Sequence, residues 1–401
     1  MMTYKHASIV PLIGGETIAQ ENVFGTKPEY ILSYSAFEAN DRQLVEYYKN
    51  KVPYHHLDGD TPYNIPSVDV INTVCPCAGL SSLSPSASST NANNDWMLST
   101  ARHVLGTLKP KVFWGENAPR LASKMGEPVV EQLKQIASQN GYTFSIYKTK
   151  SILHGLSQVR DRTFYFFWQG DKIPMLSYIE RKHEKIEDTI RNVDLHEDDP
   201  MNIIVNKNIP SKNPFYKYVL EELNNGICHS KFQDIIIKST NPLDEIEKSG
   251  IKYDQVGEWM KEKGFENEAG KCNRMYHKLK SGGNIMRKTT EIPKDYIGAF
   301  VGHMPGSLTH PDEDRYLTIR ECLSIMKLPG DFMLQGGIKN LNMICQNVPV
   351  TTAQDMAEQV QSFVHGRLDN QMIDAKFAIQ CNKKQTINYD KVSNTLEEFI
   401  C

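Results

Sequence analysis

The chain has 401 residues, of which 40% are hydrophobic and 23% are charged, and its formal net charge is −3. These values are typical of a globular protein long enough for two domains, and they exclude nucleic-acid binding that rests on overall charge rather than on a local basic surface. No stretch approaches about 18 uncharged apolar residues, so the sequence predicts no transmembrane segment.

Short apolar runs alternate with helical patterns over residues 7–168. The run at 7–13 is too short and too poorly flanked for a signal peptide, so we interpret it as a first strand. The patterns predict further strands at 29–34, 68–73, 111–114, 143–148 and 162–168, and helices at 42–50, 96–108 and 127–140. This alternation predicts an α/β fold with a Rossmann-like, doubly wound and mostly parallel sheet. Ligands bind such sheets beyond the carboxyl ends of the strands.

The rest of the chain is less regular. We interpret the acidic stretch at 187–200 as a polar connection between domains. The segment 271–294 contains seven Lys and Arg residues and one Glu, so it is either a solvated face or a surface that holds phosphates. An amphipathic helix is predicted at 353–365, and the Ser- and Asn-rich stretch at 81–94 predicts a mobile loop.

The eight cysteines are scattered and include no Cys-x-x-Cys pair. A structural zinc site and a disulfide framework are therefore both unexpected. We expect no bound metal and a reducing, cytoplasmic compartment.

Three short motifs carry the chemistry that the sequence offers. Cys77 follows Pro76 just after one predicted strand, and Glu116 follows the next predicted strand. Arg160 and Arg162 belong to the run Gln-Val-Arg-Asp-Arg that begins at Gln158. Taken singly, a cysteine after an apolar run is usually a small buried hydrophobe, and the charged residues are usually solvated or paired. The order and the local contexts of all three motifs make them informative.

In this order the motifs resemble the core motifs of the DNA cytosine-5 methyltransferase family of bacteria and phages. Cys77 matches the family's Pro-Cys motif, and Glu116 matches its Glu-Asn-Val motif, with Ala118 in place of the valine. The run at 158–162 matches its Gln-x-Arg-x-Arg motif, with Ser157 in place of a common preceding proline. Two later segments are similar to the family's last motifs, 315–321 and 346–350. The resemblance covers nearly the whole chain except the middle, and it implies a class I methyltransferase fold with a second, smaller target-recognition domain.

The resemblance implies S-adenosylmethionine as the methyl donor and S-adenosylhomocysteine as the product. Glu38 stands where an acidic residue binds the ribose hydroxyls, and Asp60 stands where an aspartate meets the adenine amino group. The full set of implied cofactor-binding residues is Ile13, Gly14, Gly15, Glu38, Asp60, Pro76, Asn347 and Val348.

Three positions near the cofactor depart from the family pattern. Val10 replaces a phenylalanine, and Leu12 and Gln346 each replace a glycine. A leucine side chain would crowd the close approach of backbone and ligand that a glycine permits. Leu12 and Gln346 fall near the methionine end of the cofactor, and they leave a modified donor as an alternative.

The resemblance also assigns catalytic roles. The thiolate of Cys77 would add to carbon 6 of cytosine, which makes carbon 5 nucleophilic towards a methyl donor. Glu116 would protonate the ring at N3, Arg162 would hold the O2 oxygen, and Arg160 would help to organise the site. The cytosine would first leave the duplex stack. Cys75, two residues before Cys77, is expected to be structural.

Double-stranded DNA is the implied partner of a monomeric protein without a membrane partner, and a cognate restriction endonuclease stays open. The implied location is the cytoplasm of a bacterial or phage-infected cell, at the nucleoid. Candidate DNA-binding residues are Ser81, Gln158, Lys278, Lys280, Arg287 and Lys288. The expected domains are a catalytic and cofactor-binding domain at 1–185, a target-recognition domain at 186–334, and a segment at 335–401 that returns to the catalytic domain.

Two other functions stay open from the sequence. One is methylation of cytosine in transfer RNA, because one branch of the family acts on that substrate. The large middle segment favours DNA, since an enzyme that reads duplex sequence needs such a domain. The other is a non-catalytic DNA-binding relative that has kept the fold, which the change at Leu12 motivates.

Overall fold

The computed structural model describes residues 4–59, 65–76, 79–81, 84, 86–209, 253–281, 295–302 and 304–382. Their contacts divide the chain into two compact units, and each is described separately. The larger unit consists of the described residues within Met1–Glu184, Leu323–Gln335 and Met343–Cys401, and the smaller unit of those within Lys185–Cys322 and Gly336–Asn342. The domain limits expected from the sequence, after residues 185 and 334, remain a prediction.

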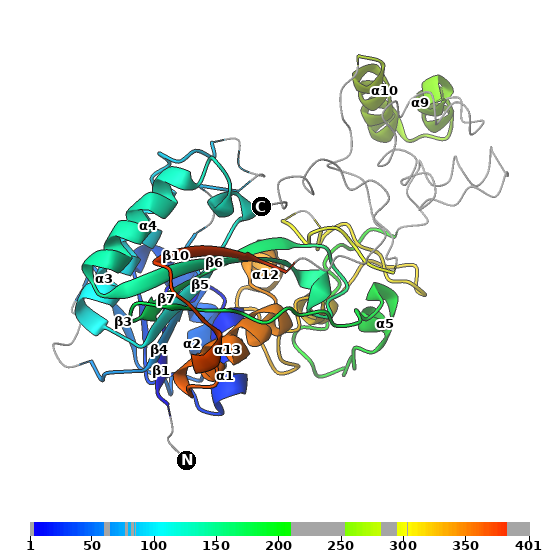
Figure 1. Ribbon diagram of the computed structural model, residues 1–401. Coiled ribbons are helices and arrows are strands. Elements are labelled where there is room, and N and C mark those ends of the chain that lie inside the picture. Colours follow the sequence, from blue (N-terminus) through cyan, green and yellow to red (C-terminus); the bar gives the residue numbers. More distant parts are fainter. Residues whose placement is uncertain are drawn as a thin grey trace. The chain divides into compact units, whose positions relative to one another are not determined.

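The larger unit is built on one sheet (Figure 1), which has eight strands within the described residues, in the order β10-β6-β7-β5-β4-β1-β2-β3. All neighbouring pairs are parallel except those of β7 with β5 and β6, which are antiparallel. The predicted α/β fold with a mostly parallel sheet is therefore confirmed. The strands are β1 (His6–Ile9), β2 (Ile31–Ser33), β3 (Tyr54–His56), β4 (Val70–Thr73), β5 (Val112–Asn117), β6 (Tyr142–Lys150), β7 (Asp161–Gln169) and β10 (Phe377–Cys381). A separate pair joins β8 (Ile173–Pro174) and β9 (Met372–Ile373).

The helices of the described residues are α1 (Gly15–Phe24), α2 (Glu38–Tyr47), α3 (Asn93–His103), α4 (Glu127–Gln139), α5 (Ile186–Arg191), α9 (Tyr253–Glu262), α10 (Glu266–Lys280), α11 (Ile319–Ile325), α12 (Leu341–Gln346) and α13 (Val350–Val364). Shorter 3₁₀ turns lie at Ser35–Phe37, Pro119–Ala122, Ser151–Leu153, Gly337–Asn340 and Asp369–Gln371, and a π-helix at Val104–Leu108 continues α3. No helix in the described ranges is long and apolar enough to span a membrane.

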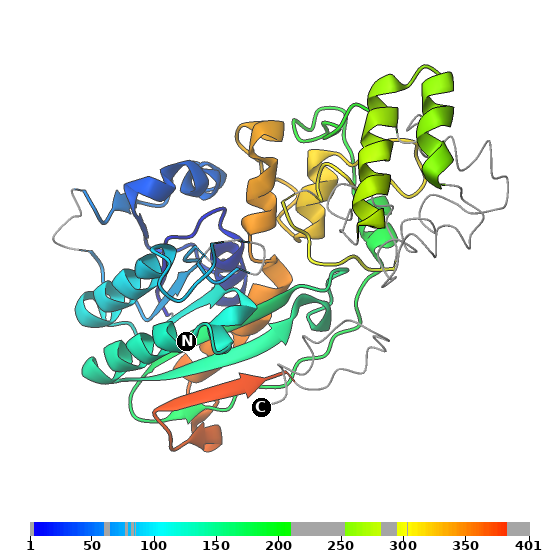
Figure 2. The ribbon, with the colours of Figure 1, turned by 90° about the horizontal axis from the view of Figure 1, so that it is seen from above.

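Helices cover both faces of the sheet. α1 packs against α13 on one face, and α3 packs against α4 on the other (Figure 2). The aromatic and β-branched residues of β5, β6 and β7 favour strands, and most of their side chains are buried between these helical layers. The core of the larger unit therefore lies on both sides of the three central strands.

Two elements differ from the sequence prediction for clear reasons. The first strand ends at Ile9 rather than at residue 13, because Val10 and Leu12 take left-handed backbone conformations with φ of 49° and 52°. Helix α1 follows at once, although the periodicity predicts no helix there. Its residues Gly15 to Gln20 are all buried, so no polar face marks the helix in the sequence.

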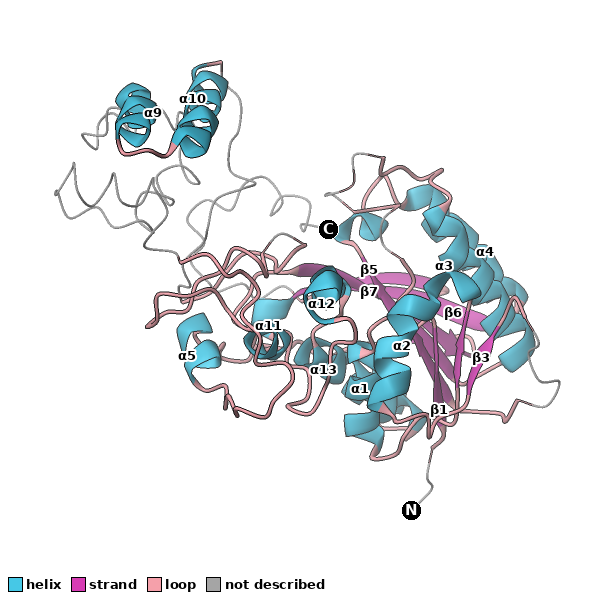
Figure 3. Cartoon of the chain, turned by 180° about the vertical axis from the view of Figure 1, so that it is seen from behind, coloured by secondary structure: helices cyan, strands magenta, loops and turns pink. Residues whose placement is uncertain are grey.

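The acidic stretch at 187–200 is more than the polar connection we expected. Ile186 and Ile190 of α5 are buried in the smaller unit, and Arg191 donates to both carboxylate oxygens of Asp312 at 2.7 Å. Asp199 likewise accepts two hydrogen bonds from Arg320, at 2.6 and 3.0 Å. Two residues of this stretch, Arg191 and Asp199, thus pair with oppositely charged residues more than a hundred positions later in the chain. In the same unit, α9 and α10 pack against each other (Figure 3), and α10 carries part of the basic segment.

Candidate active site

The candidate site lies at the carboxyl ends of β1, β4 and β5. These strands are parallel neighbours, so the segments that follow them meet at one edge of the sheet. The glycine loop follows β1, Cys75 and Pro76 follow β4, and Glu116 is the next-to-last residue of β5. Strand β7 runs antiparallel to β5, so its first residues lie beside the last residues of β5, with Phe164 opposite Glu116. This register explains why Arg162 comes to the same edge.

Glu116, which is buried, and Arg162, which is half-buried, form an ion pair there, between the Oε1 atom of the carboxylate and the Nε atom of the guanidinium. Arg162 also donates from Nη1 to the Asp161 carbonyl at 2.8 Å. The structure thus brings together the two residues that the resemblance assigns to different atoms of one pyrimidine ring. The last two residues of β5, Glu116 and Asn117, are both buried, so the backbone that carries Glu116 is held in place by packing.

Arg160 makes a different set of contacts. Its Nη2 atom donates to the carbonyl of Cys345 at 2.8 Å and to that of Asn347 at 3.2 Å. Asn347 in turn accepts the Gly15 N–H at Oδ1, at 2.8 Å. A Cβ atom on Gly15 would overlap both the Val348 carbonyl and the Asn347 side chain, so only glycine fits. Arg160 therefore positions the segment that closes on the glycine loop.

The position of Leu12 is unusual. Its left-handed backbone is a conformation that costs an L-residue roughly 1–2 kcal/mol. Its N–H donates at 3.1 Å to Asp41 Oδ1, and the other oxygen of Asp41 accepts from the Tyr54 hydroxyl at 3.0 Å. Burial raises the pKa of Asp41 to about 7, against the lowering effect of hydrogen bonds from Ser33, Tyr54 and Leu12. The buried carboxyl group of Asp41 thus holds the backbone of Leu12 in its left-handed conformation.

Of the two residues predicted to bind the nucleoside part of the donor, one lies within the described residues. Glu38 is exposed in the first turn of α2, and Asp60 lies outside the described residues. Sequence reasoning missed Asp58, which accepts the N–H and the hydroxyl of Ser35 at 2.9 and 2.7 Å. It also missed a half-buried aromatic cluster after β2, in which the Trp96 ring lies 4.7 Å from Tyr34 and 5.0 Å from Phe37.

The predicted nucleophile, Cys77, also lies outside the described residues. Pro76 before it is half-buried, and so is Ser81, whose carbonyl accepts from Arg120 at 3.4 Å. Cys75 is buried, with its Sγ atom 3.4 Å from the Thr73 hydroxyl, and burial raises the pKa of its thiol. Cys75 therefore has the surroundings of a packing residue rather than of a reactive thiolate.

The candidate DNA contacts have different surroundings in the described residues. Gln158 has 0% exposure, and its amide donates towards the Ile325 carbonyl and the Met326 sulfur at 3.4 and 3.3 Å. It holds protein segments together instead of facing solvent, which differs from the expected DNA contact. Lys280 is exposed at the end of α10, Lys278 belongs to the same helix, and Arg287 and Lys288 lie outside the described residues.

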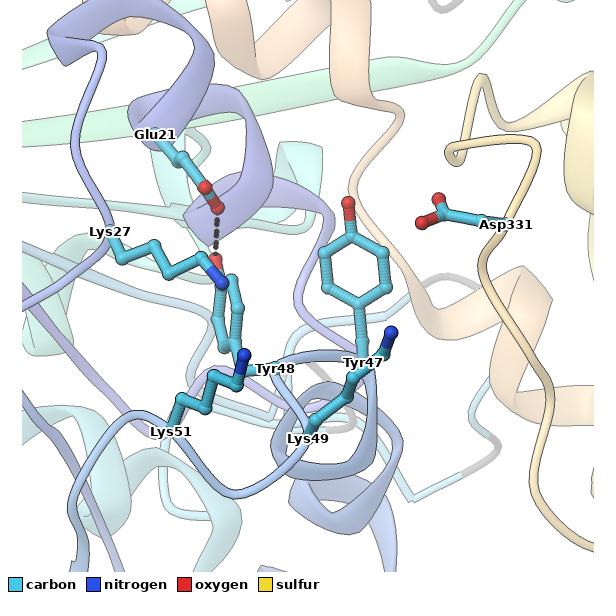
Figure 4. A pocket seen from close by; sticks show the side chains of 7 residues that line it. All are labelled: Glu21, Lys27, Tyr47, Tyr48, Lys49, Lys51 and Asp331. Carbon is cyan, nitrogen blue, oxygen red and sulfur yellow. Dashed lines mark hydrogen bonds between the residues drawn. The ribbon is translucent and has the colours of Figure 1, made fainter.

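A pocket elsewhere in the larger unit is lined by Glu21, Lys27, Tyr47, Tyr48, Lys49, Lys51 and Asp331 (Figure 4). Its lysines precede β2 and β3, so it lies at the amino ends of the strands and away from the candidate site. No group of His, Cys, Asp or Glu in the described residues has a geometry that could hold a metal ion.

The sequence also matches a known family model. The model of the C-5 cytosine-specific DNA methylases matches residues 6–362 of the chain. The chain therefore belongs to this family and is a DNA cytosine-5 methyltransferase. No protein of curated function matches the chain significantly in sequence.

Solved structures agree on the fold. The chain is similar to the methyltransferase EhMeth of Entamoeba histolytica, with a TM-score of 0.53 and 12% identity over 91% of this chain and 99% of that one. It is also similar to a putative DNA modification methyltransferase encoded within a prophage of E. coli, with a TM-score of 0.56 and 14% identity over 90% and 99% of the two chains. A mutant DNMT2 of Spodoptera frugiperda is similar with a TM-score of 0.50 and 10% identity, over 89% of this chain and 99% of that one. At such identities the likeness shows the fold.

Proposed function

We propose that the protein transfers a methyl group from S-adenosylmethionine to carbon 5 of a flipped-out cytosine in duplex DNA, through a covalent adduct on Cys77. The observation that supports this most directly is the ion pair of buried Glu116 and half-buried Arg162 at the carboxyl edge of the sheet. One carboxyl group and one guanidinium side by side match the N3 and O2 edge of a cytosine, which offers two adjacent acceptors. The family membership supplies the reaction class.

The proposed chemistry divides among three side chains. The thiolate of Cys77 forms a bond to carbon 6, and the electron pair released into the ring is relieved when Glu116 donates a proton to N3. Arg162 donates hydrogen bonds to O2 during all of these reaction steps, and its ion pair keeps Glu116 in place between turnovers. Carbon 5 takes the methyl group as S-adenosylhomocysteine leaves, and a water molecule then accepts the carbon 5 proton. Release of the thiolate and return of the N3 proton to Glu116 restore the aromatic ring.

Residues of the glycine loop and of the last motif fit the donor. Asn347 Nδ2 is buried beside that loop and, within the described residues, has no hydrogen-bond partner, so it can donate to a polar ligand atom. S-adenosylmethionine supplies a methyl group on positively charged sulfur. We propose that Ile13, Gly14, Gly15, Glu38, Asp60, Pro76, Asn347 and Val348 bind it, with Asn347 anchored by Gly15 and Arg160.

DNA must reach this site with its target base unstacked, which costs a few kcal/mol. We propose that the loop at 81–94 closes over the flipped nucleotide, with Ser81 at its base, and that Lys278, Lys280, Arg287 and Lys288 hold phosphates. Gln158 supports this arrangement from the interior. The enzyme would act on nucleoid DNA in the cytoplasm as a monomer.

The decisive experiment is transfer of labelled methyl to duplex DNA by Cys77→Ser, with Cys75→Ser as the matched control. Cys77→Ser should lose activity by at least about a thousandfold, because a hydroxyl is a far weaker nucleophile than a thiolate. Cys75→Ser should keep most activity, because the thiol of Cys75 is buried against Thr73. Equal losses in both variants, or full activity in Cys77→Ser, would overturn the assignment. The same assay with transfer RNA tests the RNA alternative.

A further inference from the structure

Glu16 is the second residue of α1 and directly follows the glycine loop. Its exposure is 0%, and neither carboxyl oxygen has a hydrogen-bond partner among the described residues. Buried polar groups are nearly always hydrogen-bonded, and a buried carboxyl group without a partner strongly destabilises the fold unless it stays neutral. Such a residue either destabilises the fold without a function or interacts with a ligand that binds beside it.

The surroundings of Glu16 place it at the reacting end of the candidate site. Its charge acts on the carboxyl group of Glu116, on the thiol of Cys75 and on the hydroxyl of Tyr165. Burial, and then the carboxylate of Glu116, raise the pKa of Glu16 well above its ordinary value. Among the described residues, the charged group that acts on Glu16 is therefore another carboxyl group, that of Glu116, and no cation offsets it.

The donor that the proposed function requires is a cation. S-adenosylmethionine carries a positive sulfonium and a positive α-ammonium group, and both belong to its methionine end. We propose that the carboxylate of Glu16 is the counter-ion for this positive charge when the donor is bound. The inference rests on the proposed function, because the glycine loop before Glu16 binds the donor in that proposal. It also accounts for Asn347 Nδ2, the other buried polar group without a described partner at the same loop, which would serve the donor's carboxylate.

Three ligands that differ in charge test the inference by calorimetry. S-adenosylmethionine has both positive groups, S-adenosylhomocysteine has only the ammonium, and 5′-methylthioadenosine has neither. In Glu16→Gln, binding of S-adenosylmethionine should weaken by about tenfold to a hundredfold, the range of a lost interaction with a charged group. Binding of 5′-methylthioadenosine should change less than about twofold. The result for S-adenosylhomocysteine identifies the cation: an equal loss points to the ammonium, and no loss points to the sulfonium.

Glu21→Gln is the matched control, because Glu21 lies on the same helix in the pocket of Figure 4, where it accepts from the Tyr48 hydroxyl at 2.7 Å. It should bind all three ligands as the wild type does. Glu16→Leu should reproduce the losses of Glu16→Gln, since it also removes the charge. In addition, the wild type should release a proton when S-adenosylmethionine binds, measured in buffers of different ionisation enthalpy, and Glu16→Gln should not.

Two results would overturn the inference. If Glu16→Gln weakens all three ligands equally, Glu16 only shapes the site. If it weakens none, Glu16 has no contact with the donor. A wild type that binds none of the three ligands would instead contradict the proposed donor itself, so the two failures are distinguishable.

Discussion

Two buried carboxylates on neighbouring helices of the larger unit have opposite surroundings. Glu16 on α1 has no described hydrogen-bond partner, whereas Asp355 on α13 is surrounded by them. His154 Nδ1 lies 2.8 Å from Asp355 Oδ2, and Arg181 Nε donates to Asp355 at 3.1 Å. In the neutral ring with its proton on Nδ1, His154 also accepts at Nε2 from the Thr149 hydroxyl at 2.7 Å.

The pKa values of the two groups are therefore shifted in opposite directions. Burial tends to raise the pKa of Asp355, but the hydrogen bonds from His154 and Arg181 outweigh it and hold the pKa below its ordinary value. Burial raises the pKa of Glu16 with nothing to oppose it. The comparison teaches that burial alone does not reveal the purpose of a charged residue. A carboxylate with protein partners stabilises the fold, and one without them is available to a ligand.

Asp355→Ala should have the largest effect on stability. It leaves the buried His154 ring without its acceptor, and removal of one member of a buried pair costs about 3–5 kcal/mol. The outer part of Arg181 is exposed and adds little. We expect a loss near the lower end of that range, about 3 kcal/mol, measured by urea unfolding at pH 7.

The control on the same helix is Glu358→Ala. The Glu358 side chain is 46% exposed and lies 3.8 Å from Arg181, so its loss should change the free energy of unfolding by less than about 1 kcal/mol. Because the folded pKa of Asp355 is depressed, its contribution is present above the unfolded value of about 3.9 and is lost as the pH falls through the folded pKa. The difference between wild type and Asp355→Ala should thus shrink below about pH 4. A difference that is constant from pH 7 to pH 3 would show that cavity formation, and not charge, explains the loss.

Arg160 combines the two behaviours, since it is a buried charge with protein partners beside the ligand site. Arg160→Met should leave the Cys345 and Asn347 carbonyls unpaired and cost about 2–3 kcal/mol of stability. It should also weaken donor binding, because Asn347 loses its anchor. Arg160→Lys should recover part of the stability only, since an ammonium group lacks the planar fork of a guanidinium. Unfolding in urea and calorimetry with S-adenosylhomocysteine measure both effects, and unchanged donor binding in Arg160→Met would limit the residue to a structural role.

Much of the fold could be predicted because alternating apolar runs and turns are local signals. The central strands and α4 fall within a few residues of their predicted positions, since their apolar residues recur at the strand and helix periods. Helix α1 and strands β3 and β10 could not be predicted. The first six residues of α1 are all buried, so no polar face marks its start, and the two edge strands are short or half-exposed and depend on pairing with a neighbouring strand.

The candidate site shows the same division. The sequence pointed to Glu116 and Arg162 separately, and only the antiparallel register of β5 and β7 shows why they meet. Gln158 was predicted to contact DNA because a sequence motif does not show whether a side chain is buried, and in the structure Gln158 is buried. Glu16 was missed although a signal existed: a charged residue stands directly after Gly14 and Gly15, where the helix start will be buried. A sequence does not show that such a charge lacks a partner, since partners come from distant segments.

The smallest expected effect is a gain in stability, and it tests the unpartnered state of Glu16 without any ligand. With a raised pKa, the folded protein keeps a proton that the unfolded chain releases, so Glu16 lowers stability as the pH rises above the unfolded value of about 4.3 towards the folded pKa. Glu16→Gln removes this proton linkage. At pH 8 it should raise the free energy of unfolding, because the unfolded wild type gains stability by releasing the proton, and at pH 4 the gain should vanish. Thermal unfolding at the two pH values measures the difference. A variant that is less stable than the wild type at pH 8 would mean that Glu16 has a stabilising partner within the protein, and the contrast with Asp355 would then disappear.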